Sequence, residues 1–197
     1  MEFNEVLKAR RSIYALDNKV SVPETQIRSL LEEAVLHTPS AFNSQSARTV
    51  LLLNKSHDQL WSLSKEALRK VVPADQFKPT DDKINAFNAA YGTVLFFEDQ
   101  AVVKGLMDAF PLYQKNFPVW SKESSGMLQF VVWGELAQAG LGASLQHYNE
   151  LIEGDVKQAF DIPESWKLVA QMPFGNPIAD VNEKTFLPLE GRLIVKS

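Results

Sequence analysis

The chain has 197 residues, of which 45% are hydrophobic and 22% charged, and its formal net charge is −4. This length predicts one domain over residues 1–197, and the acidic balance argues against a general nucleic-acid-binding surface. The sequence contains no cysteine, which excludes disulfides, thiolate metal sites, Cys-ligated iron–sulfur clusters and cysteine nucleophiles. Any redox chemistry must therefore come from a bound cofactor.

The N-terminal stretch is predicted to form a helix rather than a targeting signal. It lacks the basic and apolar regions of a signal peptide, and no apolar run approaches the ~20 residues of a membrane span. We therefore expect a cytoplasmic protein with no membrane partner. Phe3, Val6 and Leu7 recur at helical spacing. Arg10 continues that face, where a buried guanidinium needs an anion partner, unless Arg10 and Arg11 form a solvated helix end.

A second helix is predicted to begin with a capping box from Ser21 to Glu24. Pro39 ends it and opens a polar loop over residues 38–46. The apolar run Thr49–Leu53 follows, and we interpret it as a strand buried on both faces. A loop between a helix and a strand is where a scaffold commonly places small-molecule contacts. Its Ser, Asn and Gln side chains suit a flat heterocycle rather than a metal.

The middle of the chain alternates helix and strand patterns. Ser56 or Asp58 is predicted to cap a helix, and His57 beside that start is expected at the surface. A weaker helix is predicted over 81–90 and a second buried strand over 92–97.

Glu98 and Asp99 follow that strand. Adjacent carboxylates point to opposite faces of a strand, so we expect them to cap the next segment and assign them no chemistry. Residues 99–118 are mixed, because Phe110–Tyr113 and Phe117–Pro118 would break any long helix. We interpret this segment as a mobile lid or substrate-side element, although its aromatic residues fit core packing equally well.

Residues 124–140 carry the longest helical pattern, which is apolar nearly all round. In a chain of this size, that predicts a dimer interface on one side. The Gly-rich turn over 140–148 includes His147, to which we assign a contact role. No Ser/His/Asp arrangement is evident, and the three histidines have no metal-ligand spacing. We therefore predict no catalytic side chain and no metal site.

The remaining predicted elements are a short helix over 153–160, a strand over 166–173, a turn over 174–177, a polar excursion over 178–190 and a terminal strand over 192–196.

Four short motifs occur in a fixed order along the chain. They are Ala9-Arg10-Arg11-Ser12, Pro39-Ser40-x-x-Asn43-Ser44-Gln45, the long helix ending at Gly140-Leu141-Gly142, and Phe174-Gly175-x-Pro177. Together they resemble the nitroreductase family of FMN-dependent oxidoreductases. The stretch over 143–148 resembles the fatty-acid-repression branch of that family.

The resemblance implies an α+β fold with a mostly antiparallel central sheet wrapped by helices, and an intertwined homodimer with FMN at its interface. It assigns the FMN phosphate and pyrimidine edge to Arg10, Arg11 and Ser12. The polar loop would reach the flavin from the partner subunit. The contacts it implies from this loop are Pro39, Ser40, Asn43 and Gln45.

The resemblance also places Leu145, Gln146 and His147 along one flavin face. Lys184 matches a late basic residue that helps to hold the phosphate in the family.

The chain departs from the family pattern at three places. Tyr14 stands where many members have Lys. Phe186 stands where many have Arg, so Arg192 is expected to supply the missing charge. Residues 145–147 replace a Pro-Ile/Val-Gly run, which fits the divergent branch.

The activity that the resemblance implies is hydride transfer from NADH or NADPH, through FMN, to nitroaromatic, quinone or similar acceptors in a ping-pong mechanism. The flavin carries the chemistry, so the absence of a triad or metal cluster is expected. The resemblance also suggests a role in the response to oxidative stress. The alternative is a flavin-binding regulatory or stress-response protein with little turnover, and a third possibility is a structural α+β dimer without cofactor.

Overall fold

The computed structural model describes residues 2–196. Within them the sheet has five strands, with the order β1-β5-β3-β2 and with β4 added beside β5. All neighbouring strands pair antiparallel. The strands are β1 (Leu16–Asp17), β2 (Ala47–Leu53), β3 (Gly92–Asp99), β4 (Gly142–Ala143) and β5 (Trp166–Pro177).

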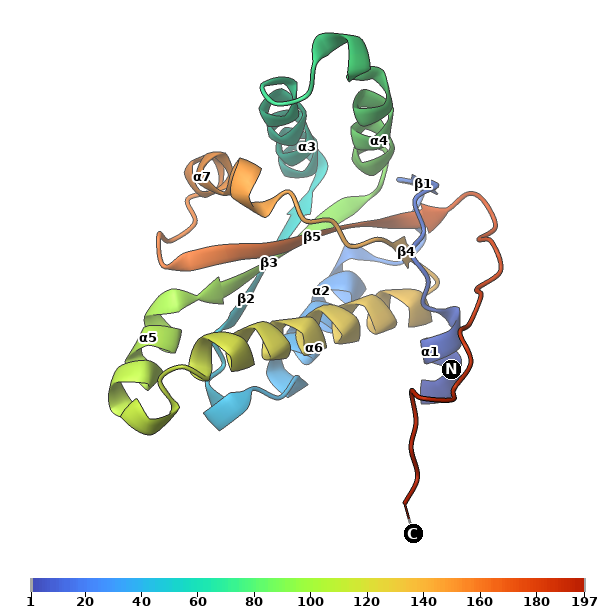
Figure 1. Ribbon diagram of the computed structural model, residues 1–197. Coiled ribbons are helices and arrows are strands. Elements are labelled where there is room, and N and C mark those ends of the chain that lie inside the picture. Colours follow the sequence, from blue (N-terminus) through green and yellow to red (C-terminus); the bar gives the residue numbers. More distant parts are fainter. Residues whose placement is uncertain (1, 197) are drawn as a thin grey trace.

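Helices cover both faces of this sheet (Figure 1). On one face lie α3, α4 and α7, and on the other lie α2 and the long α6. The helices are α1 (Phe3–Ala9), α2 (Glu24–His37), α3 (Asn54–Arg69), α4 (Lys78–Asn88), α5 (Gln100–Ala109), α6 (Phe117–Gln138) and α7 (Asn149–Ala159), with 3-10 turns η1 (Ala41–Asn43), η2 (Ala74–Gln76) and η3 (Pro111–Tyr113). The predicted α+β fold with a mostly antiparallel central sheet is confirmed.

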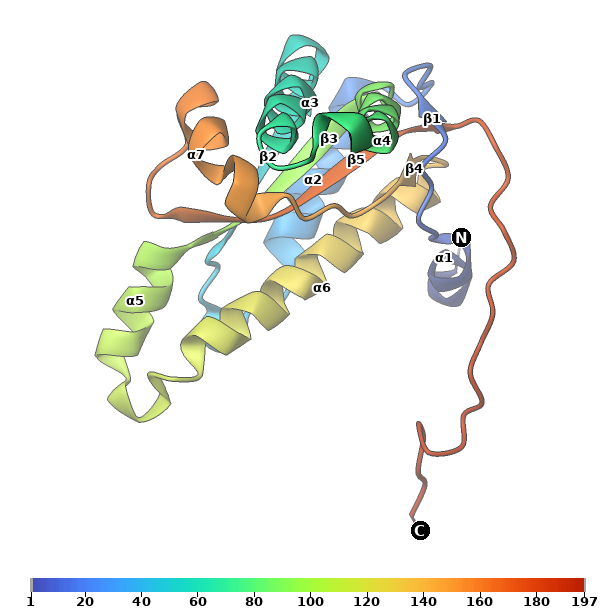
Figure 2. The ribbon, with the colours of Figure 1, turned by 45° about the horizontal axis from the view of Figure 1, so that its top comes forward.

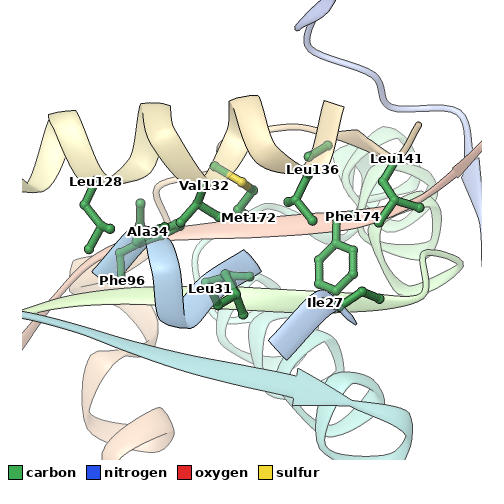
Figure 3. Close-up of a cluster of buried hydrophobic side chains, with 13 residues drawn as sticks. Ile27, Leu31, Ala34, Phe96, Leu128, Val132, Leu136, Leu141, Met172 and Phe174 are labelled. Carbon is green, nitrogen blue, oxygen red and sulfur yellow. The ribbon is translucent and has the colours of Figure 1, made fainter. Parts of the chain in front are cut away.

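Side-chain alternation along β3 divides the core into two layers. Val94 and Phe96 face the cluster beneath α2 and α6, whereas Leu95 and Phe97 face the cluster beneath α3, α4 and α7. Successive side chains of a strand point to opposite faces, so a strand that is apolar at every position is buried on both. Figure 3 shows the first cluster, in which α6 lies over the sheet with α2 beside it.

The edge strand β2 differs from its prediction. It pairs only with β3 among the described strands, and of its residues only Leu52 is buried. The predicted burial on both faces is therefore wrong, because the outer edge of β2 and much of its surface have no cover within residues 2–196. A strand with an open edge is a site for pairing with another chain.

Residues 99–118 are more regular than predicted. They form α5 and η3, and α6 already begins at Phe117. Pro118 lies in the first turn of α6, where a missing backbone N–H costs no hydrogen bond. The proline therefore starts the long helix rather than breaking it.

Two predicted helix caps are not formed. The residue before α2 is Pro23, which makes no side-chain cap bond, and α3 begins at Asn54, directly after β2. His57 consequently lies inside α3, and it is 2% exposed rather than at the surface.

The C-terminal tail over residues 178–196 contains no helix and no strand, so the predicted terminal strand is absent from the single chain. The predicted turn over 174–177 belongs to β5. After β5 the tail runs past α1 and ends away from the sheet (Figure 2). Among residues 2–196, no helix is both long and apolar enough to cross a membrane.

Candidate cofactor-binding site

Two adjacent arginines follow α1. The guanidinium carbon of Arg10 lies 4.4 Å from the ring centre of Trp133 on α6, a cation–π contact. Its Nε is buried and has no hydrogen-bond partner within residues 2–196. Burial lowers the pKa of Arg10, and the charge of Arg11 lowers it further. Arg11 donates from Nη2 to the backbone oxygen of Asn182 at 2.7 Å.

The arginine pair lies beside the turn that follows α6. Ser12 forms a parallel bridge with Ala143, and the N–H of Ile13 donates to the Ala143 oxygen at 2.9 Å. Gly142 eases this approach, because a Cβ there would lie 3.1 Å from the Cβ of Ile13. The structure thus brings together the first predicted motif and the predicted turn.

The turn is fixed to the sheet by backbone bonds. Gln146 exchanges two of them with Gln171 of β5, at 2.7 and 2.9 Å. The Gln146 side chain is buried and donates to Ser144 Oγ at 3.1 Å. Leu145 packs partly against the core. Of the three predicted flavin contacts here, only His147 has an exposed side chain.

Gln171 of β5 also fixes this turn, although the sequence did not point to it. It is fully buried. Its Oε1 accepts from the backbone N–H of Tyr148 at 2.8 Å, and its Nε2 donates to Asn149 Oδ1 at 2.6 Å. These bonds hold the end of the turn against β5. The available signal was an amide between apolar neighbours, Ala170 and Met172, in the middle of the strand.

The loop over residues 38–46 has an unusual backbone. Phe42, Asn43 and Gln45 have φ angles of 58°, 51° and 48°, a region that non-glycine residues rarely occupy. The N–H of Gln45 donates to Ser40 Oγ at 2.9 Å. Pro39, Asn43 and Gln45 are exposed. Ser40 therefore holds the loop together, while the other three predicted contacts are available to a ligand.

Phe42 joins this loop to the segment predicted as a lid. Its ring centre lies 5.0 Å from that of Phe110, 5.8 Å from Tyr113, 5.2 Å from Phe117 and 5.9 Å from Trp120. An apolar groove of about 450 Å³ adjoins this cluster. The aromatic residues of the segment therefore pack against the loop.

The loop and the arginine pair are far apart within one chain. The loop packs near Trp120, and Arg10 packs on Trp133. These two α6 positions are separated by roughly 20 Å at the helical rise of 1.5 Å per residue. A single copy therefore does not combine the two groups in one pocket.

The late basic residues lie in the exposed tail. The Nζ of Lys184 is 5.3 Å from the ring centre of Phe186, and Arg192 donates to the Leu187 oxygen at 3.2 Å. The bond from Arg11 to Asn182 brings the start of the tail beside the arginine pair. No hydrogen bond or ion pair within residues 2–196 joins Arg192 to that pair.

The two carboxylates after β3 have different roles. Asp99 caps α5 by accepting from the Ala101 N–H at 3.1 Å, as predicted. Glu98 does not cap a helix. It is buried, and its Oε2 accepts from Ser46 Oγ at 2.6 Å and from Ser121 Oγ at 2.8 Å. Across the described residues, no group of three or more His, Asp or Glu side chains is arranged to hold a metal.

Comparison with known proteins gives consistent matches. The model of the Nitroreductase family matches residues 7–176. HBN1 of Saccharomyces cerevisiae, provisionally named a nitroreductase, is 37% identical over 185 residues, covering 93% of this chain and 92% of that protein. The nitroreductase FRM2 of the same yeast is 32% identical over 182 residues, covering 90% and 89%.

A solved structure is also similar over its whole length. The nitroreductase CinD from Lactococcus lactis, in complex with chloramphenicol, has a TM-score of 0.92 and 44% identity. The match covers 100% of both chains.

Proposed function

This chain belongs to the nitroreductase family and is an oxidoreductase, and we propose that it uses FMN to transfer a hydride from NADH or NADPH to an organic acceptor. The match to FRM2 also confirms the fatty-acid-repression branch. A more distant structure of this fold from Exiguobacterium sibiricum, 17% identical to this chain, is described as a complex with FMN.

The observation that carries the FMN proposal is the unmatched charge of the arginine pair. Arg10 and Arg11 form no ion pair within residues 2–196, where arginine ion pairs involve Arg28, Arg48 and Arg69. The buried Nε of Arg10 has no partner, and a buried polar group without a partner is costly. A flavin phosphate, with about two negative charges near neutral pH, would accept from both guanidinium groups.

In this proposal Arg10, Arg11 and Ser12 bind the phosphate and the pyrimidine edge, and Lys184 and Arg192 add positive charge from the tail. A guanidinium beside the ring system stabilises negative charge that develops there. The chemistry that bound FMN supplies is hydride uptake from the nicotinamide and reduction of the acceptor, in ping-pong order. We assign no nucleophile, catalytic acid or metal ligand to the chain.

We propose that the site is shared between two copies in a homodimer. The separation of the loop from the arginine pair supports this, because a second chain is needed to combine them. The exposed part of α6 carries Val119, Met127 and Phe130, which are apolar residues suited to an interface. In such a dimer Pro39, Asn43 and Gln45 of one copy would contact the flavin held by the other.

The tail supports an intertwined form of this dimer. Leu193, Ile194 and Val195 are 66%, 74% and 82% exposed, a high degree of exposure for an apolar run that contains two β-branched residues. The open edge of β2 borders a groove of about 810 Å³ between α2 and β2. We propose that the tail of each copy adds a strand to the β2 edge of the other, in the manner of strand addition.

Nitroaromatic compounds and quinones are the proposed acceptors. CinD was solved with chloramphenicol and with 4-nitrophenol, and both compounds carry a nitro group on an aromatic ring. The exposed face of the loop and the aromatic cluster of Phe42 offer flat apolar surface to such a ring.

An anaerobic absorbance spectrum of the purified protein tests the proposal. We expect flavin bands near ~450 nm that bleach on adding NADH or NADPH and return on adding a quinone or nitroaromatic compound. A protein that stays colourless after incubation with FMN would overturn the proposal and favour a structural dimer without cofactor.

One observation favours a second function. Tyr14, where many family members have Lys, is exposed, and its ring centre lies 6.4 Å from that of Phe87. A flavin site with Tyr14 at this position would therefore have one cation fewer than in many family members. Flavin bands that persist after adding either nicotinamide would favour a flavin-binding regulatory or stress-response protein with little turnover.

A further inference from the structure

A buried carboxylate fastens the end of the loop over residues 38–46. Glu98 of β3 is 2% exposed, and its Oε2 accepts from both Ser46 and Ser121. Ser46 is the last residue of the loop and is fully buried, and Ser121 belongs to α6. One carboxylate oxygen therefore joins the central sheet, the end of the loop and the long helix.

Packing alone does not account for a carboxylate at this place. The other oxygen, Oε1, is buried without a hydrogen-bond partner in the described residues. Burial raises the pKa of Glu98, while the two serine hydroxyls and the nearby Arg48 oppose that rise. An apolar side chain of similar volume would avoid the cost of burying the charge. The carboxylate therefore provides something that an apolar contact cannot, which is a directional link to two hydroxyls.

The loop needs such a link because its backbone is strained. Three of its residues have positive φ, and residues in these regions persist only when their surroundings hold them there. Arg48 adds a second attachment, donating from Nη1 to the Gln45 oxygen at 2.6 Å and pairing with Asp99 at 3.1 Å. Both attachments act where the loop joins β2.

We propose that Glu98 is a positioning residue for the cofactor site, holding Asn43 and Gln45 in the geometry with which they contact FMN bound by the second copy. This inference rests on the proposed function. It predicts that Glu98 acts in trans: the carboxylate of one chain supports the flavin site built on the arginine pair of the other.

The first test measures the FMN dissociation constant of the apoprotein by quenching of flavin fluorescence. Glu98→Met and Ser121→Ala should each raise it on the order of tenfold, because the binding-competent loop becomes a smaller fraction of the population. Glu98→Gln keeps an acceptor oxygen and should restore most of the affinity.

A matched control separates positioning from general stability. Ser64 is also buried on a helix, α3, and its Oγ donates to the Leu60 oxygen at 2.9 Å. Ser64→Ala removes a buried hydroxyl that has no contact with the loop and should leave the FMN dissociation constant unchanged. Equal FMN affinity in wild type, Glu98→Met and Ser121→Ala would overturn the inference.

The second test uses mixed dimers, purified through two different tags, of an Arg10→Ala chain with a Glu98→Met chain. If Glu98 acts in trans, one site combines the wild-type arginines of the second chain with the wild-type loop of the first. One FMN per two chains should then bind with wild-type affinity. If Glu98 acts within its own chain, both sites are impaired, and the absence of any tight site would overturn the inference. Ser121→Ala replaces Glu98→Met if that variant does not fold.

A benchmark shows which proposal has failed. Mixed dimers of Arg10→Ala with Asn43→Ala chains should recover one tight site for the same geometric reason. If this pair recovers a site and the Glu98 pair does not, only the inference on Glu98 is wrong. If neither pair does, or if wild type binds no FMN, the shared flavin site itself is wrong and the inference falls with it.

Discussion

Arg10 combines a stacking contact on Trp133 with a buried Nε that lacks a partner. Arg10→Ala should weaken FMN binding by roughly 1.5–3 kcal/mol, because it removes a charge-assisted contact to the phosphate. Fluorescence titration of the apoprotein measures this. Arg69→Ala, which breaks pairs with Glu66 and Asp81 on α3 and α4, should leave FMN affinity unchanged. Wild-type affinity in Arg10→Ala would contradict the assignment of the arginine pair.

His57 forms a complete hydrogen-bond chain in its neutral form. Trp61 Nε1 donates to Thr93 Oγ1 at 3.0 Å, and that hydroxyl lies 2.9 Å from His57 Nδ1. His57 Nε2 lies 3.2 Å from the Asn88 oxygen. A neutral His57 ring that accepts at Nδ1 from the Thr93 hydroxyl and donates at Nε2 to the Asn88 oxygen gives each of these groups a hydrogen-bond partner. A second proton, on Nδ1, would make Thr93 Oγ1 accept from both rings and leave the Thr93 hydroxyl hydrogen without an acceptor, so the site favours the neutral ring.

This preference makes stability depend on pH. Burial lowers the pKa of His57 in the folded chain, whereas the unfolded chain titrates near ~6.5. As pH falls below that value, the unfolded state binds a proton that the folded state does not, and the free energy of unfolding decreases. His57 lowers the free energy of unfolding by at most ~1.4 kcal/mol per pH unit. This loss stops once the pH falls below the pKa that His57 has in the folded chain.

Urea unfolding at pH 7.5 and 5.5 checks this expectation. Wild type should lose more stability between the two values than His57→Gln, which has no group to titrate at that place. His37→Gln, at an exposed residue of α2, serves as control and should behave like wild type. A pH dependence that is the same in wild type and His57→Gln would show that other groups cause it.

At the scale of single residues, the sequence led to a proposed set of cofactor contacts, but it did not show which way their side chains point. The ordered motifs led to Arg10 and to the stretch around His147, and the structure brings both beside β4. They gave no sign that Gln146 turns inward or that Glu98 is buried. Those orientations depend on Ser144 and on α6 contacts, which no local pattern encodes.

Between elements, the junction of β1 with β5 depends on a glycine. A Cβ on Gly175 would lie 2.5 Å from the Asp17 oxygen and 3.0 Å from the Tyr91 nitrogen. Gly175→Ala should therefore destabilise the fold by roughly 1–3 kcal/mol, measured by urea unfolding. Gly154→Ala on the exposed side of α7, where no atom lies within 4 Å, should instead stabilise by about 0.5–1 kcal/mol. If both substitutions changed the free energy of unfolding equally, the backbone around Gly175 would have room for a Cβ.

Elements whose own pattern determines them were predicted well. The continuous apolar run of β3 gave a strand buried on both faces, and the pattern of α6 gave the longest helix. Elements that depend on distant partners were not. A similar apolar run in β2 produced an edge strand, because strand order is a property of the whole sheet. Pro118 marked a helix start rather than a break, since only its position within the first turn decides between them.

For the molecule as a whole, the tail is the feature that a single chain leaves unexplained. The double substitution Leu193→Asp with Val195→Asp should shift the assembly from dimer to monomer, because it places charges on the apolar run proposed to pair with β2. Light scattering during size-exclusion chromatography measures the mass. The control, Glu183→Ala with Glu190→Ala in the same tail, should remain dimeric. A dimer that survives the aspartates would place the interface elsewhere, on α6 for example.

The sequence predicted a strand over 192–196 that the single chain does not form. Its β-branched residues are consistent with strand formation, but the partner edge that would satisfy their backbone groups lies on another copy in the proposed dimer. The structure of a single chain cannot contain such a pairing, and a single sequence cannot indicate where the partner strand lies.

In the proposed dimer, the placement of the loop and the arginine pair toward opposite ends of α6 would couple cofactor retention to the amount of protein present. Each complete site would exist only in the assembled state, so dilution would release flavin by mass action, and added flavin would draw separated copies back together. Catalytic rate per chain would then decline on dilution. Flavin supply would therefore regulate assembly without any separate regulatory site.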